Sequence, residues 1–468
     1  MPRRFAIIGA GIAGLAAAIC LSKELTPKRS DLEIVIYERS QEISTAGGAI
    51  SLTPTAQRHL DDLGVLSKLN QMGSEAGVEV DTIDLFALNS GRHLGPLRLT
   101  ALKDAGCDKY KGRRVKRISL ALAMVAVIED LPNVSILYGK QLTGGSTTND
   151  GVALTFGDGT AVSADLALGC DGVHSPTRTQ IVDPGNQSKY SGVSFVQSIT
   201  NALETSQSTR SETTSLHIGR HGSILTSYCD PNRDKLFIAA VLKVNELLIE
   251  RYYAALEGDA AAQNSMNMSL RYLVRTQSNN SRLTALREMV DQAEDWALCP
   301  VYQVRPGRPW HRGRIMLLGD AAHAVHFTLP NPAPILTVEE TTANSQQMPP
   351  RDESTTHALE DAIILARTLS RNIDQPIATS FEEFESERRA FIDNAFDESF
   401  HLWQRNQDLA ASFNYLKDPM SPIARPESPD VSDDRIPALS VPMPMNDSFS
   451  DLSVCSLTQE YLGSHGII

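Results

Sequence analysis

The chain has 468 residues, of which 41% are hydrophobic and 21% charged, so it can bury a large core and is expected to contain two or more domains. Its formal net charge of −13 at pH 7 argues against nucleic acid or an anionic membrane surface as the main partner. Residues 5–21 are apolar, but three glycines at dinucleotide-turn spacing oppose a signal peptide there. No later run approaches the roughly 18 apolar residues of a membrane span, so we expect no transmembrane segment.

The six cysteines are scattered along the chain without a CxxC pair, and several lie inside apolar runs. This pattern favours buried free thiols over a disulfide framework or a metal site. We therefore expect a reducing compartment, the cytoplasm, and no bound metal.

The first predicted element is a strand–helix–strand unit over residues 5–38. An uncharged apolar run forms the first strand, an alanine-rich segment the helix, and a second apolar run the next strand. The turn between the first strand and the helix contains Gly9, Gly11 and Gly14. The spacing predicts that Gly9 makes a tight turn and that Gly11 lets a pyrophosphate approach the backbone closely. It also predicts that Gly14 lets the helix pack closely on the strand.

Glu38 ends the second strand, where its carboxylate can accept hydrogen bonds from an adenosine ribose. The helix N-terminus offers unpaired N–H groups and a partial positive charge to phosphates. Glycine turns before helices are common, but here the strand, helix, second strand and terminal acid occur in register. The unit predicts dinucleotide binding, and the motif alone does not distinguish NAD from FAD.

Two segments of the next hundred residues have alternative interpretations. Gly48 and Ala49 precede a helix expected from about Pro54, and they form either an ordinary loop or a surface against which a bulky cofactor lies. A basic cluster at residues 113–117 leads into a long apolar helix. Because cations at a helix start oppose the macrodipole, the cluster either binds phosphate or forms a solvated face.

A β-meander of short strands is expected from residue 134 to residue 167, with a hairpin turn at 157–159. The meander leads into a buried strand at residues 166–168. This strand runs into Asp171 and Gly172, which form either an edge of a cofactor site or an ordinary strand–turn.

Residues from about 180 to 300 contain strand-like pieces and a helical stretch, which predict a second, mixed α/β region. A buried strand then ends in Gly319 and Asp320. An acid at the carboxyl end of a parallel strand lies where open α/β sheets bind ligands.

Three motifs now stand in one order: GAGIAG with Glu38, CDGVHSPTR, and GDAAHA followed by LEDA. Together they resemble the FAD-dependent aromatic hydroxylases, the single-component flavin monooxygenases of the salicylate hydroxylase type, which include fungal enzymes of secondary metabolism. The resemblance runs from about residue 5 to residue 389. It implies an α/β fold in which an FAD-binding, Rossmann-like (GR2-type) domain carries an inserted, mixed α/β substrate domain.

The resemblance divides the chain into segments. The FAD-binding domain is expected at 1–180 and 301–416, the substrate-binding domain at 181–300, and a disordered tail at 417–468. Residues 328–355 depart from the family pattern, because a polar, proline-rich stretch replaces the Pro-x-x-Gly-x-Gly flavin loop. This segment is either a translated intron or a genuine insertion that forms a lid.

The resemblance also implies roles for single residues. Glu38 would hold the adenosine ribose, Arg117 would contact FAD, and Asp320 would bond the ribityl chain. Three further residues would lie along the cofactor, with Gly48 and Ala49 beside the flavin, and Asp171 near the pyrophosphate and the path of NAD(P)H. Tyr228 would face the substrate or be a half-buried sheet tyrosine, and Gln197 stands where some fungal members have an arginine.

The implied reaction needs FAD, NADPH or NADH, O2 and a small-molecule substrate. Through a C4a-hydroperoxyflavin, it would hydroxylate or epoxidise an aromatic or polycyclic metabolite, plausibly in secondary-metabolite biosynthesis. Two alternatives stay open. One is a flavoprotein reductase or oxidase without oxygen insertion, and the other is a flavin-binding relic that the disrupted loop has impaired.

Overall fold

The computed structural model describes residues 4–44, 48–98, 107, 109–148, 150–202, 214–219, 222–277, 283–324 and 354–412, with side chains described up to 394. The atypical segment 328–355, except its last two residues, and the expected tail 417–468 lie outside this range.

A six-stranded sheet forms the core of what we call the first part of the molecule. Its order is β18-β19-β12-β1-β2-β8, and every neighbouring pair is parallel except β18 with β19. The strands are β1 (Arg4–Ile8), β2 (Glu33–Tyr37), β8 (Val134–Leu137), β12 (Leu166–Gly169), β18 (His311–Arg312) and β19 (Ile315–Leu317). Because the parallel strands point the same way, the residues after β1, β2, β12 and β19 meet at one edge.

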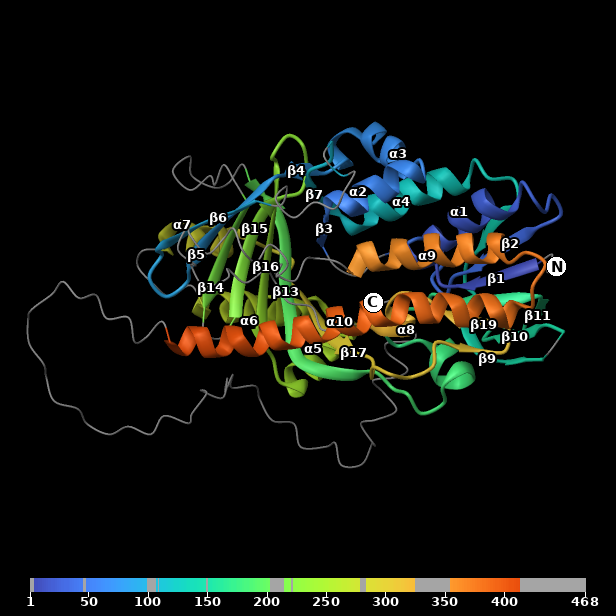
Figure 1. Cartoon of the computed structure of the whole chain (residues 1–468). Coiled ribbons are helices and arrows are strands. Elements are labelled where there is room, and N and C mark those ends of the chain that lie inside the picture. Colours follow the sequence, from blue (N-terminus) through green and yellow to red (C-terminus); the bar gives the residue numbers. More distant parts are fainter. Residues whose placement is uncertain are drawn as a thin grey trace, which may run out of the picture.

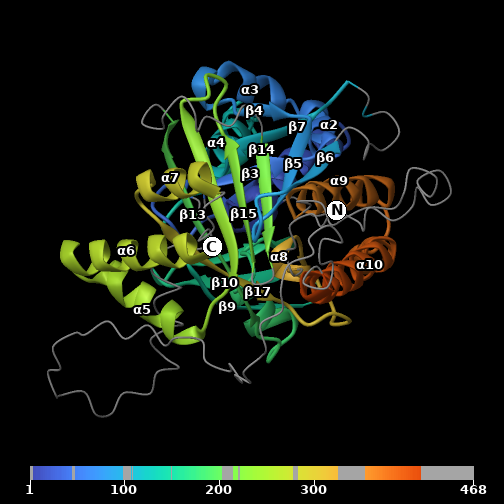
Figure 2. The same ribbon diagram turned by 90° about the vertical axis from the view of Figure 1, so that its left-hand side faces the viewer.

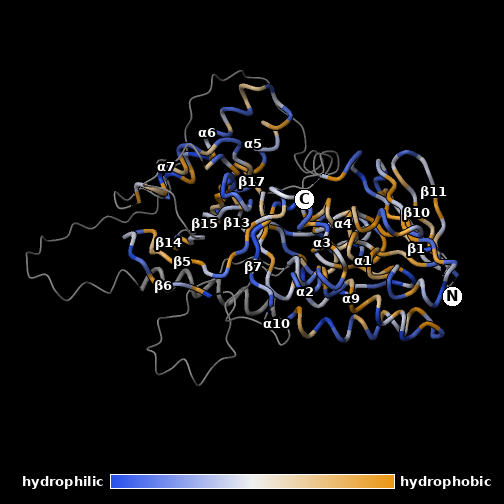
Figure 3. Tube along the Cα trace, turned by 90° about the horizontal axis from the view of Figure 1, so that it is seen from above, coloured by the Kyte–Doolittle hydropathy of each residue, from blue (hydrophilic) through white to orange (hydrophobic). Residues whose placement is uncertain are grey.

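Helices cover one face of this sheet and a small antiparallel sheet covers the other (Figure 1). The helices are α1 (Ile12–Leu25), α4 (Arg117–Ile128) and α9 (Ser354–Arg371), and the small sheet is β9 (Leu142–Thr147), β10 (Val152–Phe156) and β11 (Ala161–Ala164). Helix α1 packs against both α4 and α9, which explains why its sequence has almost no polar face. Hydrophobic residues accordingly follow α1 through the middle of the first part (Figure 3).

One expected strand has a different partner. The prediction of a β-meander over 134–167 was wrong for its first strand, because β8 pairs in parallel with β2 in the central sheet. Only β9 to β11 form the meander, and the expected turn at 157–159 connects β10 to β11. A short apolar run reads the same in either sheet, so periodicity alone does not assign its partner.

The second part is a seven-stranded sheet in the order β17-β13-β16-β15-β14-β5-β6. Its strands are β5 (Thr82–Ala87), β6 (His93–Arg98), β13 (Lys189–Asn201), β14 (Thr214–Gly219), β15 (Gly222–Tyr228), β16 (Lys235–Lys243) and β17 (Ala297–Gln303). The helices α5 (Glu246–Glu257), α6 (Ala260–Gln277) and α7 (Thr284–Gln292) gather on one side of it (Figure 2). The division by sequence segments puts residues 82–98 in the FAD-binding domain, but β5 pairs with β14 of this sheet.

A three-stranded sheet, β3-β7-β4, lies between the two parts. Its elements and the helices beside it are β3 (Ala49–Leu52), β4 (Val78–Val80), β7 (Gly112–Lys116), α2 (Pro54–Asp62), α3 (Val65–Gln71) and η1 (Gly73–Glu75). The prediction that the basic cluster forms a helix start was wrong for residues 113–116, which are strand β7. Only Arg117 begins a helix, and the Lys116 ammonium pairs with Glu75 at 2.8 Å.

Three elements complete the first part: η3 (Thr177–Val182), α8 (Asp320–His323) and α10 (Ile377–Ser412). Within the described ranges, no helix is long and apolar enough to cross a membrane.

A buried arginine joins two of these elements. Arg178 at the start of η3 is only 1% exposed, and its guanidinium donates to the carbonyl oxygens of Val173, Asn186 and Ala321. The bond to Ala321, 2.8 Å long, ties the loop after β12 to helix α8. The guanidinium supplies donors to three carbonyl groups that are shielded from water.

We predict that Arg178→Met lowers the free energy of unfolding by roughly 3–5 kcal/mol, because it leaves three buried carbonyl groups without donors. Urea unfolding measures the change. The matched control is Arg312→Met, because exposed Arg312 donates a hydrogen bond to the Ile181 carbonyl. This variant should lower the free energy of unfolding by less than about 1 kcal/mol. Equal costs for the two variants would contradict the argument.

Candidate functional site

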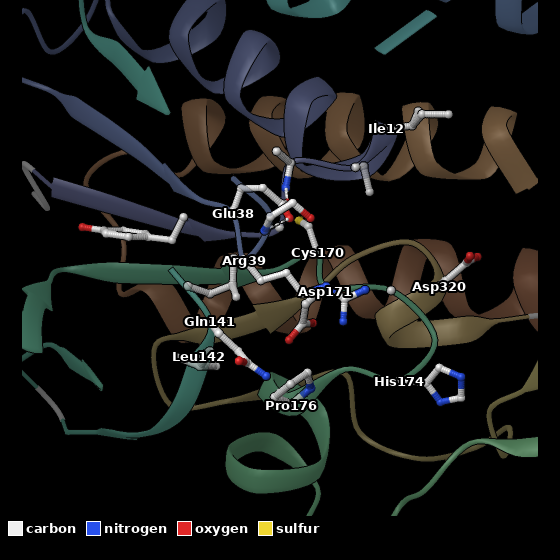
Figure 4. Close-up of a pocket in the computed structure, with 18 of the residues that line it drawn as sticks. Ile12, Glu38, Arg39, Gln141, Leu142, Cys170, Asp171, His174, Pro176 and Asp320 are labelled. Carbon is white, nitrogen blue, oxygen red and sulfur yellow. Dashed lines mark hydrogen bonds between the residues drawn. The ribbon is translucent and has the colours of Figure 1, made fainter. Parts of the chain in front are cut away.

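A cavity of about 1070 Å³ lies where the parallel strands end. Seven of the predicted site residues line it: Gly9, Gly11, Glu38, Arg117, Asp171, Gly172 and Asp320. Figure 4 shows Cys170 and Asp171 between Glu38 and Asp320, so the cavity runs along the sheet edge from the end of β2 to the start of α8. Its length and volume suit an extended ligand larger than a mononucleotide.

The three glycines of the first turn differ in what surrounds them. A Cβ on Gly9, whose φ is +101°, would lie 2.5 Å from the Cys170 carbonyl oxygen, and a Cβ on Gly14 would lie 2.0 Å from the Gly9 carbonyl oxygen. A Cβ on Gly11 would meet no protein atom within 4 Å. Gly9 and Gly14 are therefore required by backbone packing, whereas Gly11 leaves open space beside the cavity.

Helix α1 begins at this open space. Gly11 is its N-cap residue, in an extended conformation and without a side-chain hydrogen bond to the first turn. The first N–H groups of α1 are thus left to a ligand or to water, and they add to the positive end of the helix dipole. This arrangement binds a phosphate or pyrophosphate group.

The three acids at the sheet edge differ in how many hydrogen bonds their carboxylates already accept from the protein. Glu38 accepts from the backbone N–H groups of Ala10 at 2.7 Å and Ser40 at 2.9 Å, one on each carboxylate oxygen. Each oxygen keeps a second lone pair for a hydroxyl group.

Asp171 is more fully engaged. Its carboxylate accepts from the Ser175 hydroxyl and from the N–H and hydroxyl of Thr177, at 2.9 and 2.7 Å. Burial raises the pKa of Asp171, and these donors oppose the rise. The side chain therefore shapes the loop that leads into η3.

Asp320 has the opposite character. Its side chain lines the cavity, and within the described ranges no hydrogen-bond donor contacts its carboxylate. It is the sheet-edge acid with most acceptor capacity left for ligand hydroxyl groups.

Asp361 of helix α9 contacts Gly319, the residue before Asp320, and the sequence motifs predict no role for it. Its carboxylate is buried and accepts from the Gly319 N–H at 2.9 Å, from His323 Nε2 at 2.6 Å and from Arg388 Nε at 2.9 Å. Burial alone would raise the pKa of Asp361, but the charges of His323 and Arg388 and the Gly319 N–H outweigh it and hold the pKa at about 2. An acid within the apolar run of LEDAIILA was the available signal, because a buried charge must be paired.

Gly48 and Ala49 do not line the cavity. A Cβ on Gly48 would lie 2.8 Å from the Phe237 ring of strand β16, and Ala49 packs in the same hydrophobic cluster as Phe237. Small residues are needed there because the second part packs closely against β3. The Gly48 carbonyl also accepts from the Arg117 N–H at 3.1 Å, which fixes the start of α4 next to the cavity.

Gly14, Gly319 and Tyr228 also lie off the cavity lining. Tyr228 is 8% exposed and packs in the cluster that contains Tyr252 and Trp296, on the face of the seven-stranded sheet that α5 to α7 cover. This placement does not favour the expectation that Tyr228 faces the substrate. It agrees with the alternative of a buried sheet tyrosine.

Comparison with known proteins agrees with this geometry. The family model described as an FAD binding domain matches residues 4–329. The chain belongs to the FAD-dependent aromatic hydroxylases. It is therefore an FAD-dependent monooxygenase, and the predicted α/β fold with a Rossmann-like FAD-binding domain is confirmed.

Two relatives and one structure illustrate the similarity. The hydroxylase is 28% identical over 321 residues to 3-amino-4-hydroxybenzoate 2-monooxygenase PtmB3 of Streptomyces platensis, covering 68% of this chain and 73% of the relative. It is 24% identical over 378 residues to salicylate hydroxylase of Pseudomonas putida, covering 78% and 76%. The structure of Klebsiella pneumoniae HpxO complexed with FAD and uric acid has the same fold, with a TM-score of 0.65, 19% identity, and coverage of 87% and 88%.

The residues of the cavity fit FAD. The cofactor carries a pyrophosphate, which suits the open N-terminus of α1, and hydroxyl groups on both sides of it, which suit Glu38 and Asp320. Arg117, at the cavity wall, adds a cation that can orient an anionic or electron-rich group.

We predict that Gly11→Ala and Gly14→Ala separate FAD binding from folding. Gly11→Ala should change the stability of the apoprotein by less than about 1 kcal/mol, because its Cβ has room, but should weaken FAD binding at least about tenfold. Gly14→Ala should destabilise the apoprotein by more than about 3 kcal/mol, because its Cβ meets a backbone carbonyl. FAD titration and urea unfolding of the apoproteins measure both effects. Unchanged FAD affinity in Gly11→Ala would argue against pyrophosphate at this turn.

The low pKa of Asp361 predicts a dependence of stability on pH. Because the folded pKa of about 2 lies below the ordinary 3.8, the ionised group contributes stability above about pH 4, and this contribution is lost as the pH falls toward 2. The contribution is on the order of 2 kcal/mol. The difference in unfolding free energy between the wild type and Asp361→Asn should therefore shrink between about pH 5 and about pH 3. A difference in unfolding free energy that stays constant across this range would contradict the stabilising role of the ionised Asp361 carboxylate.

Proposed function

We propose that this hydroxylase uses NAD(P)H and O2 to hydroxylate or epoxidise a small, neutral aromatic or polycyclic metabolite, in secondary-metabolite biosynthesis in the cytoplasm. The observation that carries the proposal is the sheet-edge cavity, whose glycine turn, helix N-terminus and strand-end acids match the groups of FAD in order. The free thiols of the five described cysteines support the compartment.

The assignment of the site follows from the chemistry of each group. The α1 N-terminus at Gly11 binds the pyrophosphate, Glu38 accepts from the adenosine ribose, and Asp320 accepts from the ribityl hydroxyl groups. Arg117 orients the flavin from the side of α4. When bound, FAD accepts two electrons from the nicotinamide and transfers one atom of O2 to the substrate. The chain itself binds, orients and excludes water.

The substrate would lie against the face of the seven-stranded sheet that turns toward the first part. Successive strand residues alternate between faces, and Val196 and Leu298 pack under α5 to α7, so Phe195, Gln197 and Cys299 point the other way. The Cys299 thiol on this face lies within electrostatic range of Arg117. If Arg117 contacts the flavin as proposed, this face would look toward it.

The side chains of this face suit an uncharged, largely apolar ring system. Phe195 and Ile199 are partly exposed on this face and present hydrophobic surface. Phe237, the partner of Ile199 on β16, is buried against Gly48 and closes this face on the side of β3. Gln197 supplies an amide, whose Nε2 lies 3.1 Å from Cys299 Sγ. A neutral amide both donates to a carbonyl and accepts from a hydroxyl, which matches a phenol or quinone better than a carboxylate.

The experiment is NAD(P)H oxidation by the FAD-loaded protein with a neutral polycyclic phenol and a benzoate of similar ring size. The phenol should stimulate oxidation more strongly, and its product should gain the mass of one oxygen atom. Gln197→Ala should raise KM about fivefold to tenfold with little change in kcat, since one hydrogen bond to substrate is lost.

The matched control is Tyr228→Phe, which alters a polar group on the helix-covered face of the same sheet and should leave both constants unchanged. Oxidation of NAD(P)H that yields only hydrogen peroxide with every substrate would favour an oxidase without oxygen insertion. A clear preference for the benzoate would contradict the neutral substrate.

A further inference from the structure

Two sets of charged residues anchor helix α10, and they are built alike. The first, which we call the turn network, is His323, Asp361 and Arg388. The second, the strand network, is His311, Glu385 and Arg389: His311 Nδ1 lies 2.7 Å from Glu385, and Arg389 donates to the same carboxylate. In each set one carboxylate receives a histidine and an arginine, yet the two sets lie at different places on the first part.

Only the turn network contacts the backbone that presents Asp320. Gly319, with φ +58° and ψ −140°, forms the turn from β19 into α8, and its N–H donates to Asp361. His323, at the other end of the four-residue helix α8, contacts the same carboxylate oxygen. Asp361 therefore holds both the residue before Asp320 and the residue three positions after it.

Arg388 secures Asp361 from the opposite side. Its Nε donates to Asp361 at 2.9 Å and its Nη1 donates to Glu360 at 3.0 Å, so α10 binds two successive acids of α9. The three side chains of the turn network are at most 8% exposed, and none of them lines the cavity. The contacts of the turn network with Gly319 and His323 are its direct link to the backbone that presents Asp320 to the cavity.

We propose that the turn network is a positioning site for FAD, which orients the Asp320 carboxylate and the start of α8 toward the cofactor. His323, Asp361 and Arg388 are positioning residues, because they act through Asp320 and do not touch the ligand. The inference rests on the proposed assignment of Asp320 to FAD. The strand network holds α10 in place without this role.

The test compares Asp361→Asn with Glu385→Gln, each of which removes one carboxylate charge that pairs with a histidine and an arginine. Both variants should lower the thermal stability of the full-length apoprotein. Asp361→Asn should weaken FAD binding at least about tenfold in fluorescence titration and alter the visible circular dichroism of bound flavin, whereas Glu385→Gln should stay within about twofold of the wild type. Two milder variants keep the test valid if Asp361→Asn does not fold. Arg388→Lys, which retains the charge, should preserve more FAD affinity than Arg388→Met.

Wild-type FAD affinity and flavin spectrum in Asp361→Asn would overturn the inference, as would an equal loss of affinity in Glu385→Gln. In the milder pair, equal affinities for Arg388→Lys and Arg388→Met would also overturn it. Failure of the proposed FAD site looks different, because Asp320→Ala would then bind FAD as the wild type does, whatever the turn network variants show.

Discussion

The architecture depends on how closely the backbone approaches itself at the end of β1. Gly9 packs against the carbonyl of Cys170, and Gly14 packs against the carbonyl of Gly9, at distances that exclude any side chain. These contacts bring β1, β12 and the first turn of α1 into one tight unit. Because α1 then starts at the sheet edge, its free N–H groups open into the cavity rather than onto another element. At this turn the cavity wall is therefore made by backbone, and the side chains along the rest of the edge select what binds.

Some acids at this edge stabilise the fold, and others are available to bind a ligand. Asp171 is occupied by Ser175 and Thr177, and Asp361 by a backbone N–H, a histidine and an arginine. Glu38 shares its capacity between two backbone N–H groups and the cavity. Asp320 is held in place by its neighbours while its own carboxylate faces the cavity. A charge that is fully paired inside the protein is poorly suited to bind a ligand, since its acceptor capacity is already used.

Sequence reasoning was strongest where local chemistry decides the structure. The strand, glycine turn and helix at residues 5–25 follow from hydrophobic periodicity and from the conformational needs of Gly9, and the acids Glu38 and Asp320 follow from their positions after strands. It was weakest where the partner is distant in the chain. The pairing of β5 with β14, the partner of β8, the contact of Gly48 with Phe237 and the direction of Tyr228 all depend on register or packing between remote segments. In strands a shift of one residue exchanges the two faces, so the side of Tyr228 could not be deduced from a short fragment.

Contacts between segments that are distant in the chain also matter where the sequence departs from the family pattern after GDAAHA. The turn network joins Gly319 and His323, which precede the atypical segment, to Asp361 and Arg388, which follow it. Its contacts therefore fix both flanks of that segment relative to each other, independently of the intervening sequence. The entropy cost of closing a loop rises only slowly with its length, by about 0.6 kcal/mol for each doubling. Because buried charge pairs hold the two flanks together, residues added between them would cost the FAD-binding fold little stability.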